Sequence, residues 1–222
     1  MTRYIAIIPA RKNSKRIKQK NLRKIRGKVL VNYTIAAAQK VKKISKIIVT
    51  TDIEKLIKKD DSRVIYINRP KELTKDTSTT ESAMFHALNY LKSKKKIVSE
   101  NVILLQPTSP FRNDKDILKA IKKYEKGNHD SLFSAYEDKI LIWKKKKNNY
   151  EPTNYNFKKR KREQESKRMI IENGAIFIFN YKKFFHYKNR LFGNKGCYIM
   201  TRKNSIEIDD DFDLEIANSV KI

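Results

Sequence analysis

The chain has 222 residues and a formal net charge of +28, which comes from 52 basic and 24 acidic side chains. This length fits one domain. No apolar run approaches the ~18–20 residues that cross a bilayer, so the sequence excludes a membrane-spanning helix. The single cysteine, Cys197, excludes an internal disulfide and a cysteine-rich metal site. We therefore expect one cytoplasmic domain, residues 1–222, without a membrane partner.

The positive charge admits two explanations. A basic surface is typical of proteins that bind nucleic acid. However, 39 of the 52 basic residues are Lys, and Lys, Ile and Asn, which have AT-rich codons, are all abundant. We therefore favour genome composition as the source of the charge over a surface that binds polyanions. The one local peak, residues 139–168, carries 12 basic and three acidic residues. Because no zinc finger, basic zipper or RNA-recognition motif accompanies it, we expect no nucleic-acid partner.

The first 127 residues predict alternating strands and helices. Short β-branched runs indicate buried strands, and apolar residues at helical spacing indicate amphipathic helices. The expected strands are 4–9, 46–50, 64–67 and 102–105, and the expected helices are 31–41, 78–94 and 114–126. Asp52 is expected to cap a short helix after the second strand. This alternation predicts an α/β fold with a mostly parallel sheet flanked by helices.

The alternation of predicted strands and helices ends after residue 127. Strands are expected within 131–143 and at 175–179 and 205–208, and an amphipathic helix is expected to end the chain. Residues 139–170 are largely basic and polar between these strands. They predict an excursion that leaves the sheet and returns to it within the same domain.

Polar segments follow three predicted strands, and ligands bind at the carboxyl ends of strands in open parallel sheets. Arg11, Lys12, Lys15 and Arg16 follow the first strand. The guanidinium groups of the arginines and the ammonium groups of the lysines suit a polyphosphate, although a solvated basic loop would have the same composition. The segment 106–112 follows the fourth strand, and its amide and hydroxyl groups could contact a base or a sugar, unless it is only a proline-rich turn.

The last predicted strand carries an acidic cluster. Alternation places Glu207 and Asp209 on one face, where two carboxylates can share a hard cation such as Mg²⁺. Asp211 could bind the same metal or cap the terminal helix. A basic loop and an acidic pair at one sheet edge are groups that suit phosphoryl or nucleotidyl transfer.

Four motifs occur in order along the chain: Pro9-Ala10-Arg11-x-x-Ser14-Lys15-Arg16 with Lys20-Asn21, Leu105-Gln106-Pro107-Thr108-Ser109-Pro110-x-Arg112, Glu172-Asn173-Gly174-Ala175-Ile176-Phe177-Ile178, and Ile208-Asp209-x-x-x-Asp213-Leu214. Together they resemble those of the CMP-sialic acid synthetases, the acylneuraminate or nonulosonate cytidylyltransferases. The resemblance covers essentially the whole chain. It implies a Rossmann-like nucleotidyltransferase fold and a homodimer, with residues 139–170 as the dimerisation and substrate excursion. It also implies Mg²⁺- or Mn²⁺-dependent transfer of CMP from CTP to a nine-carbon 2-keto sugar acid.

The resemblance also implies roles for individual residues. Arg11, Lys15 and Asp209 would be catalytic. The nucleotide would contact Arg11, Ser14, Lys15, Asn21, Arg69, Ser78 and Thr79, and the sugar acid would contact Gln106, Arg112, Arg162, Gln164 and Asn173. Asp209 would hold the metal with Glu207 or Asp211. Ser78 could equally cap the helix that follows it, with Glu81 completing a capping box.

The sequence departs from the family pattern in two places. Lys12 and Asn13 stand where the family commonly has glycines, and Glu207 is one methylene longer than the usual aspartate. These departures and the net charge leave open a polyanion-binding protein on an inactive scaffold. The other alternative is a cytidylyltransferase for an eight-carbon (Kdo-type) sugar acid, a related family on the same fold. The sequence does not choose among the nine-carbon acids.

Overall fold

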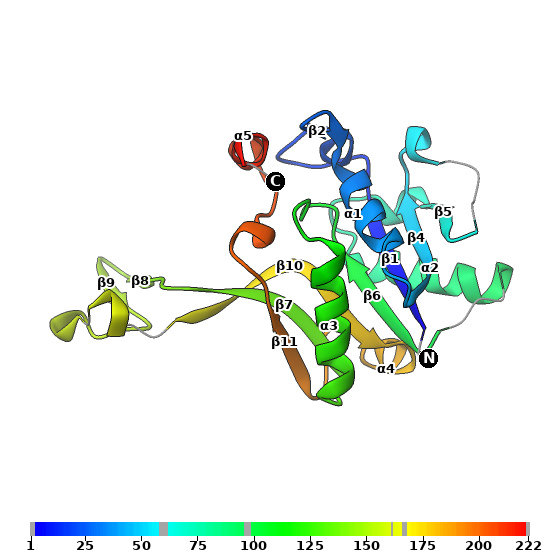
Figure 1. Cartoon of the computed structure of the whole chain (residues 1–222). Helices are drawn as coiled ribbons and strands as arrows, with labels where there is room; N and C mark the ends of the chain where they lie inside the picture. Colours follow the sequence, from blue (N-terminus) through cyan, green and yellow to red (C-terminus); the bar gives the residue numbers. More distant parts are fainter. Residues whose placement is uncertain (1–2, 58–61, 96–98, 161, 166–167, 221–222) are drawn as a thin grey trace.

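A seven-stranded sheet forms the centre of the computed structural model, which describes residues 3–57, 62–95, 99–160, 162–165 and 168–220. Its order is β11-β7-β10-β6-β1-β4-β5 (Figure 1). The bounds are β1 Tyr4–Ala10, β4 Ile44–Thr51, β5 Val64–Asn68, β6 Asn101–Leu105, β7 Ser131–Asp138, β10 Met169–Asn180 and β11 Lys195–Ile199. Strand β10 is antiparallel to β6 and β7, and the other neighbouring pairs are parallel. The predicted mostly parallel α/β fold is confirmed.

Helices cover both faces of this sheet. They are α1 (Leu30–Gln39), α2 (Thr80–Lys94), α3 (Asp114–Lys126) and α4 (Tyr181–Tyr187), whereas α5 (Asp211–Ser219) packs in a separate small core with residues of the loops after β1 and β6. Alternation along β1 separates two cores, because Ala6 and Ile8 pack with α1 and α3, whereas Ile5 and Ile7 pack with α2 and α4. Each isoleucine buried in this way contributes about 1.5–3 kcal/mol. None of the described helices is long and apolar enough to cross a membrane.

The predicted strand at 205–208 is wrong. Ser205 ends the 3-10 helix η6 (Lys203–Ser205), and the next residues make no strand ladder. The sheet instead receives its outer strand from β11. The chain near Ile208 is nevertheless tied to the loop after β6, because the Ile208 amide donates a 2.8 Å hydrogen bond to the Thr108 carbonyl. Ile208 is buried, and Glu207 and Asp209 turn toward a cavity, as alternation along an extended chain requires.

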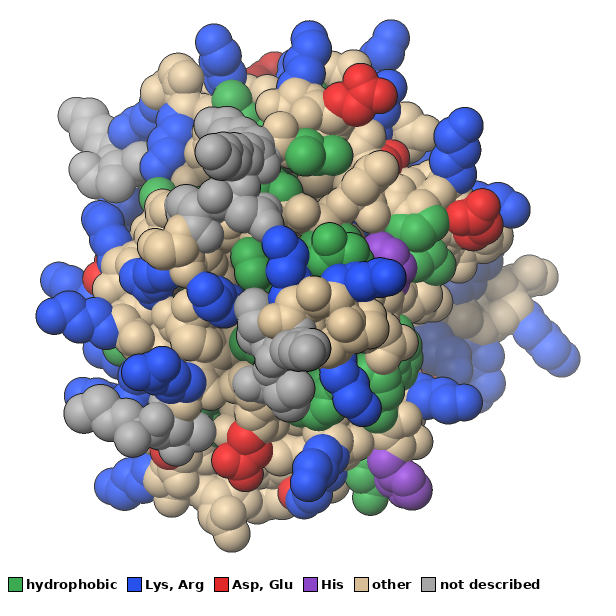
Figure 2. All heavy atoms as spheres, turned by 90° about the vertical axis from the view of Figure 1, so that its right-hand side faces the viewer, with side chains coloured by type: hydrophobic (Ala, Val, Ile, Leu, Met, Phe, Trp, Pro, Cys, Tyr) green, Lys and Arg blue, Asp and Glu red, His purple; other side chains and the backbone are tan. Residues whose placement is uncertain are grey.

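A hairpin of β8 (Trp143–Lys146) and β9 (Asn149–Pro152) extends away from the body of the molecule beyond the ends of β7 and β10 (Figure 1). The hairpin and the segment that follows it expose apolar side chains, among them Trp143, Tyr150 and Phe157. A smaller ladder pairs β2 (Lys24–Ile25) with β3 (Lys28–Val29). Basic side chains are spread over the face drawn in Figure 2 and do not form one patch there.

Candidate active site

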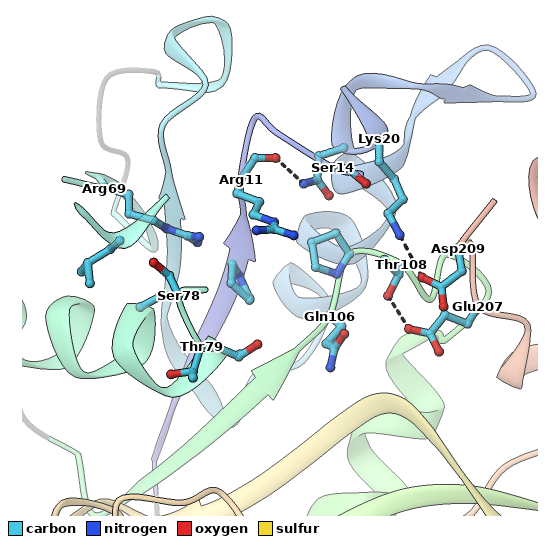
Figure 3. A pocket seen from close by; sticks show the side chains of 16 residues that line it. Arg11, Ser14, Lys20, Arg69, Ser78, Thr79, Gln106, Thr108, Glu207 and Asp209 are labelled. Atoms are coloured by element: carbon cyan, nitrogen blue, oxygen red, sulfur yellow. Dashed lines mark hydrogen bonds and ion pairs between the residues drawn. The ribbon is translucent and has the colours of Figure 1, made fainter. Parts of the chain in front are cut away.

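A cavity of about 260 Å³ opens where β1 and β6 end (Figure 3). The chain passes from β1 to β4 and β5 on one side and then crosses to β6 on the other, so the sheet order reverses between β1 and β6. Such a reversal is where open α/β sheets bind ligands. The cavity is lined by Pro9, Arg11, Ser14, Lys20, Asn21, Arg69, Leu73, Ser78, Thr79, Thr80, Ala83, Gln106, Pro107, Thr108, Glu207 and Asp209.

The basic loop after β1 follows a path that does not need glycine. Lys12 and Asn13 have no positive φ, and the left-handed residue is instead Gln19, with φ of 53°. The loop is held from two sides. The Asn21 amide donates to the Arg11 carbonyl at 2.9 Å, and Asp52 accepts a 2.7 Å hydrogen bond from the Lys12 backbone amide. Asp52 therefore fixes the loop and does not cap the 3-10 helix η2 (Glu54–Leu56), whose N-cap residue is Ile53.

Arg69 forms one wall of the cavity. It follows β5, is 6% exposed, and its Nη2 donates to the Thr50 carbonyl at 2.8 Å. Burial lowers the pKa of Arg69 to about 10, so the side chain is still charged at neutral pH. In Figure 3 its guanidinium points into the cavity. A buried, fixed guanidinium that reaches a cavity can donate hydrogen bonds to a carbonyl or phosphate oxygen.

The start of α2 brings two hydroxyl groups to the same wall. Thr79 caps the helix, since its Oγ1 accepts from the Ser82 amide at 3.1 Å, and Ser78 instead donates to the Glu72 carbonyl at 3.0 Å. Glu81 does not complete a capping box with Ser78, because it forms a 2.8 Å ion pair with Arg190. The helix therefore begins at Thr80, two residues later than expected, and both predicted nucleotide contacts line the cavity.

Glu207 and Asp209 form the acidic side of the cavity. Thr108 Oγ1 donates to Glu207 Oε1 at 3.0 Å, and Lys20 Nζ donates to Asp209 Oδ1 at 2.9 Å. Burial, followed by the negative charge of Asp209, raises the pKa of Glu207 above its usual value. Lys20 and Thr108 are absent from the sequence-predicted site. Both belong to the sequence motifs, but only the hydrogen bond to Asp209 distinguishes Lys20 from the other lysines of the basic loop.

The side chains of Glu207 and Asp209 are of the chemical type that binds a divalent cation. Carboxylate oxygens are the ligands that Mg²⁺ and Mn²⁺ prefer, and a nearby cation would offset the charge repulsion that raises the Glu207 pKa. Asp211 does not line the cavity. It lies in the first turn of α5, with its Oδ1 3.7 Å from Arg23 Nη2, and the helix is capped by Asp210. Within the described residues no cluster of three or more His, Cys, Asp or Glu side chains could hold a metal.

Two predicted substrate contacts are buried in the framework around the cavity. Arg112 is 1% exposed, and its guanidinium donates to the Ala175 carbonyl at 3.2 Å and to Thr34 Oγ1 at 2.7 Å. Asn173 is 3% exposed and hydrogen-bonded within β10 and to its neighbours. Arg112 therefore ties β10 to α1 and to the loop after β6, and Asn173 ties β10 to β7 and to the end of η6.

Three further predicted residues lie outside the cavity lining. Lys15 is 71% exposed, and its Nζ lies 3.7 Å from Asp76 Oδ2 at the edge of the basic loop. Arg162 and Gln164 are exposed residues of the excursion, beyond the hairpin. The structure thus brings together Arg11, Ser14, Asn21, Arg69, Ser78, Thr79, Gln106, Glu207 and Asp209 from the predicted set.

The sequence profile of the cytidylyltransferase family matches residues 5–222. The chain belongs to this family. It is 32% identical to the N-acylneuraminate cytidylyltransferase of Escherichia coli, over 99% of this chain and 52% of that protein, so it spans about half the length of that relative. It is 29% identical to the pseudaminic acid cytidylyltransferase of Campylobacter jejuni, over 96% of this chain and 94% of that one.

A solved structure has the same fold. It is that of a CMP:2-keto-3-deoxy-manno-octonic acid synthetase complexed with CTP, with a TM-score of 0.68, 14% identity, and 98% of each chain covered. The match to the cytidylyltransferase family, with relatives named for N-acylneuraminate and pseudaminic acid, agrees with the resemblance that the four motifs indicated.

Proposed function

We propose that this protein transfers CMP from CTP to the anomeric hydroxyl of a nine-carbon 2-keto sugar acid and releases pyrophosphate. One observation carries the proposal: a single cavity at the reversal point of the sheet joins the cations Arg11, Lys20 and Arg69 to the pair Glu207 and Asp209. The relatives named for N-acylneuraminate and pseudaminic acid support this substrate class.

CTP would lie along the wall from α2 to the basic loop. Arg69, Ser78 and Thr79 would contact the cytidine, because they approach the cavity from β5 and the start of α2. Arg11, Ser14 and Lys15 would hold the triphosphate, with Asn21 fixing the carbonyl at the start of the loop. Lys15 would reach the phosphates from the cavity edge, since its side chain is largely exposed.

In the reaction the anomeric hydroxyl oxygen attacks the α-phosphorus and its proton passes to solvent. The bond from that phosphorus to the oxygen that bridges the α- and β-phosphates breaks, and this oxygen leaves with pyrophosphate. Negative charge grows on the leaving pyrophosphate, where preorganised cations are most effective. Arg11, Lys15 and Lys20 would supply this stabilisation. Glu207 and Asp209 would hold Mg²⁺ or Mn²⁺, which when bound adds positive charge to the phosphates.

The sugar acid would bind beyond Gln106. A second cavity of about 290 Å³ adjoins the first through Glu207 and is lined by Tyr136, Glu172 and Arg202 among others. A mixture of acidic, basic and aromatic groups suits a polyhydroxylated acid. Asn173 also lines this cavity, although its amide is engaged in hydrogen bonds that brace the wall. Arg112 does not line it and would act by bracing β10 from behind.

We also propose that the chain works as a homodimer in the cytoplasm, where CTP is available. The excursion at 139–170 exposes Trp143, Tyr150 and Phe157 far from the sheet, and a second subunit would bury them. Light scattering would test this. The wild type should have the mass of a dimer, and Trp143→Lys should shift it toward the monomer.

Pyrophosphate release with CTP and Mg²⁺ tests the reaction, against a panel of neuraminic, legionaminic, pseudaminic and eight-carbon sugar acids. Release with a nine-carbon acid, and its loss in Asp209→Asn, is the expected result. Release only with the eight-carbon acid would favour the Kdo-type alternative, which the shared fold supports. No release with any acid, together with duplex binding that survives ~200 mM salt, would favour the polyanion-binding alternative.

A further inference from the structure

One acid beside the cavity has no role in the mechanism above. Asp76 Oδ1 lies 3.3 Å from Arg11 Nη1, and Asp76 Oδ2 lies 3.7 Å from Lys15 Nζ. A single carboxylate thus faces both proposed triphosphate ligands, with one oxygen turned to each. Arg11 Nη1 also lies 3.5 Å from the neighbouring Lys75 carbonyl, so two acceptors of one segment hold the guanidinium.

Asp76 belongs to the segment between the 3-10 helix η3 (Lys71–Leu73) and α2. The same segment carries Ser78 and Thr79, which line the cavity where the cytidine is proposed to lie. A turn fixes its backbone, because the Ser78 amide donates to the Lys75 carbonyl at 3.0 Å. Asp76 therefore links the loop that would hold the phosphates to the segment that would contact the base.

The other acids near the basic loop are engaged elsewhere. Asp52 accepts from the Lys12 backbone, and Asp209 pairs with Lys20 and Arg16. Within the described part of the chain, Asp76 is the acid that pairs with Arg11 or Lys15. Long basic side chains that are substantially exposed lose rotamer freedom when a ligand fixes them, so an acid that already fixes them lowers the cost of binding.

We propose that Asp76 is a positioning residue for the triphosphate: its carboxylate holds Arg11 and Lys15 together at the cavity edge before the nucleotide arrives. The inference rests on the proposed function, because it requires CTP in this cavity. The inference also predicts whether Asp76 strengthens or weakens CTP binding. A carboxylate that preorganises the two cations strengthens CTP binding, whereas one that merely competed with the phosphates would weaken it.

Calorimetric titration of the full chain with CTP and with cytidine tests this. Two exposed ion pairs predict that Asp76→Ala weakens CTP binding by about 2- to 10-fold. Cytidine binding should stay within about twofold, because cytidine carries no phosphate for Arg11 and Lys15 to hold. Asp76→Glu, which retains the carboxylate, should recover most of the affinity for CTP. Glu125→Gln is the matched control, since it breaks a surface ion pair with Lys43 at the opposite sheet edge.

A second pair of variants tests whether Asp76 acts through the two cations. In a chain with Arg11→Met and Lys15→Met, adding Asp76→Ala should change CTP affinity no further. A further loss in that background, an equal loss of CTP and cytidine binding in Asp76→Ala, or tighter CTP binding would each overturn the inference alone. A wild-type chain that binds no CTP would overturn the proposed function and the inference with it.

Discussion

The substitution Asn173→Ala separates a structural role from the substrate contact that the family motif implies. Asn173 uses both ends of its amide. Its Oδ1 accepts from Ser134 Oγ at 2.6 Å and from the Ala175 amide at 3.2 Å, and its Nδ2 donates to Ser205 Oγ at 2.8 Å. The strand register of β10 against β7 shifts at this place. The side chain therefore pins an irregular part of β10 to β7 and to the end of η6.

The cost of removing the amide follows from these contacts. Alanine leaves the Ala175 amide and the Ser134 hydroxyl without the oxygen to which they donate, and each buried unpaired group costs ~1–3 kcal/mol. With the small void that remains, the loss is about 3–5 kcal/mol. For a chain of this size each kcal/mol lowers the melting temperature by ~2–4 °C, which gives a fall of roughly 6–20 °C.

Thermal unfolding followed by circular dichroism measures this fall. Gln106→Ala is the matched comparison, because Gln106 lines the cavity and should alter the KM for the sugar acid with little effect on melting. Asn173→Ser should lose less stability than Asn173→Ala, since a hydroxyl can still accept from the Ala175 amide. If Asn173→Ala melts within ~2 °C of the wild type and raises the KM for the sugar acid, the structural argument fails and the motif assignment stands.

Three further substitutions test separate contacts. Lys20→Met should lower turnover by at least ~100-fold, the scale of one lost oxyanion-type donor, because Lys20 Nζ contacts Asp209 inside the cavity; a near-normal turnover in the pyrophosphate assay would remove Lys20 from the machinery. Asn113→Ala removes the capping box of α3 and should cost ~0.5–2 kcal/mol in urea unfolding, with CTP affinity unchanged. A loss of CTP affinity in that variant would contradict the placement of α3 away from the cavity. Asp130→Asn tests pH dependence: the hydrogen bond from Lys183 lowers the Asp130 pKa, so its stabilisation is present above the usual value and is lost as the pH falls through the folded-state pKa. The melting temperatures of wild type and variant should differ by a constant amount above about pH 5 and converge as the pH falls below the usual carboxyl value of 3.8. A difference that stays constant down to about pH 2 would refute the assignment.

The sequence predicts the inner strands well, for a physical reason. Strands β1 and β6 are covered on both faces, so nearly every side chain is apolar and the run is unmistakable. Strand β11 escapes prediction because it pairs only with β7 and includes Lys195, Gly196 and Cys197, none of them β-branched. Segment 205–208 shows the converse error. Apolar alternation identifies an extended backbone, and it does not establish that a neighbouring strand is present.

The site is predictable in its segments and less so in its individual residues. Strand ends and motifs locate the loops correctly, because the carboxyl ends of parallel strands meet at one edge. Arg112 has the chemistry of a substrate ligand but lies in the core, where burial lowers its pKa to about 10 and backbone carbonyls take its hydrogen bonds. Lys20 is the opposite case, a residue of the site that the sequence did not predict. Composition makes it one lysine of many, and its contact with a residue far along the chain makes it part of the site.

These contacts change how the charge of +28 is understood. Lysine is abundant throughout this sequence, and basic side chains are spread over the face drawn in Figure 2, so a single basic residue carries little information about function. The carboxylates carry more. Asp52, Asp76, Glu207 and Asp209 lie at or beside the cavity, and each has a partner in the basic loop or the loop after β6. Exposed charges are screened beyond about 8–10 Å, so these short-range pairs, and not the net charge, shape the field that a triphosphate would meet. In a chain with so many lysines, the positions of the carboxylates therefore indicate the candidate active site better than the positions of the basic residues do.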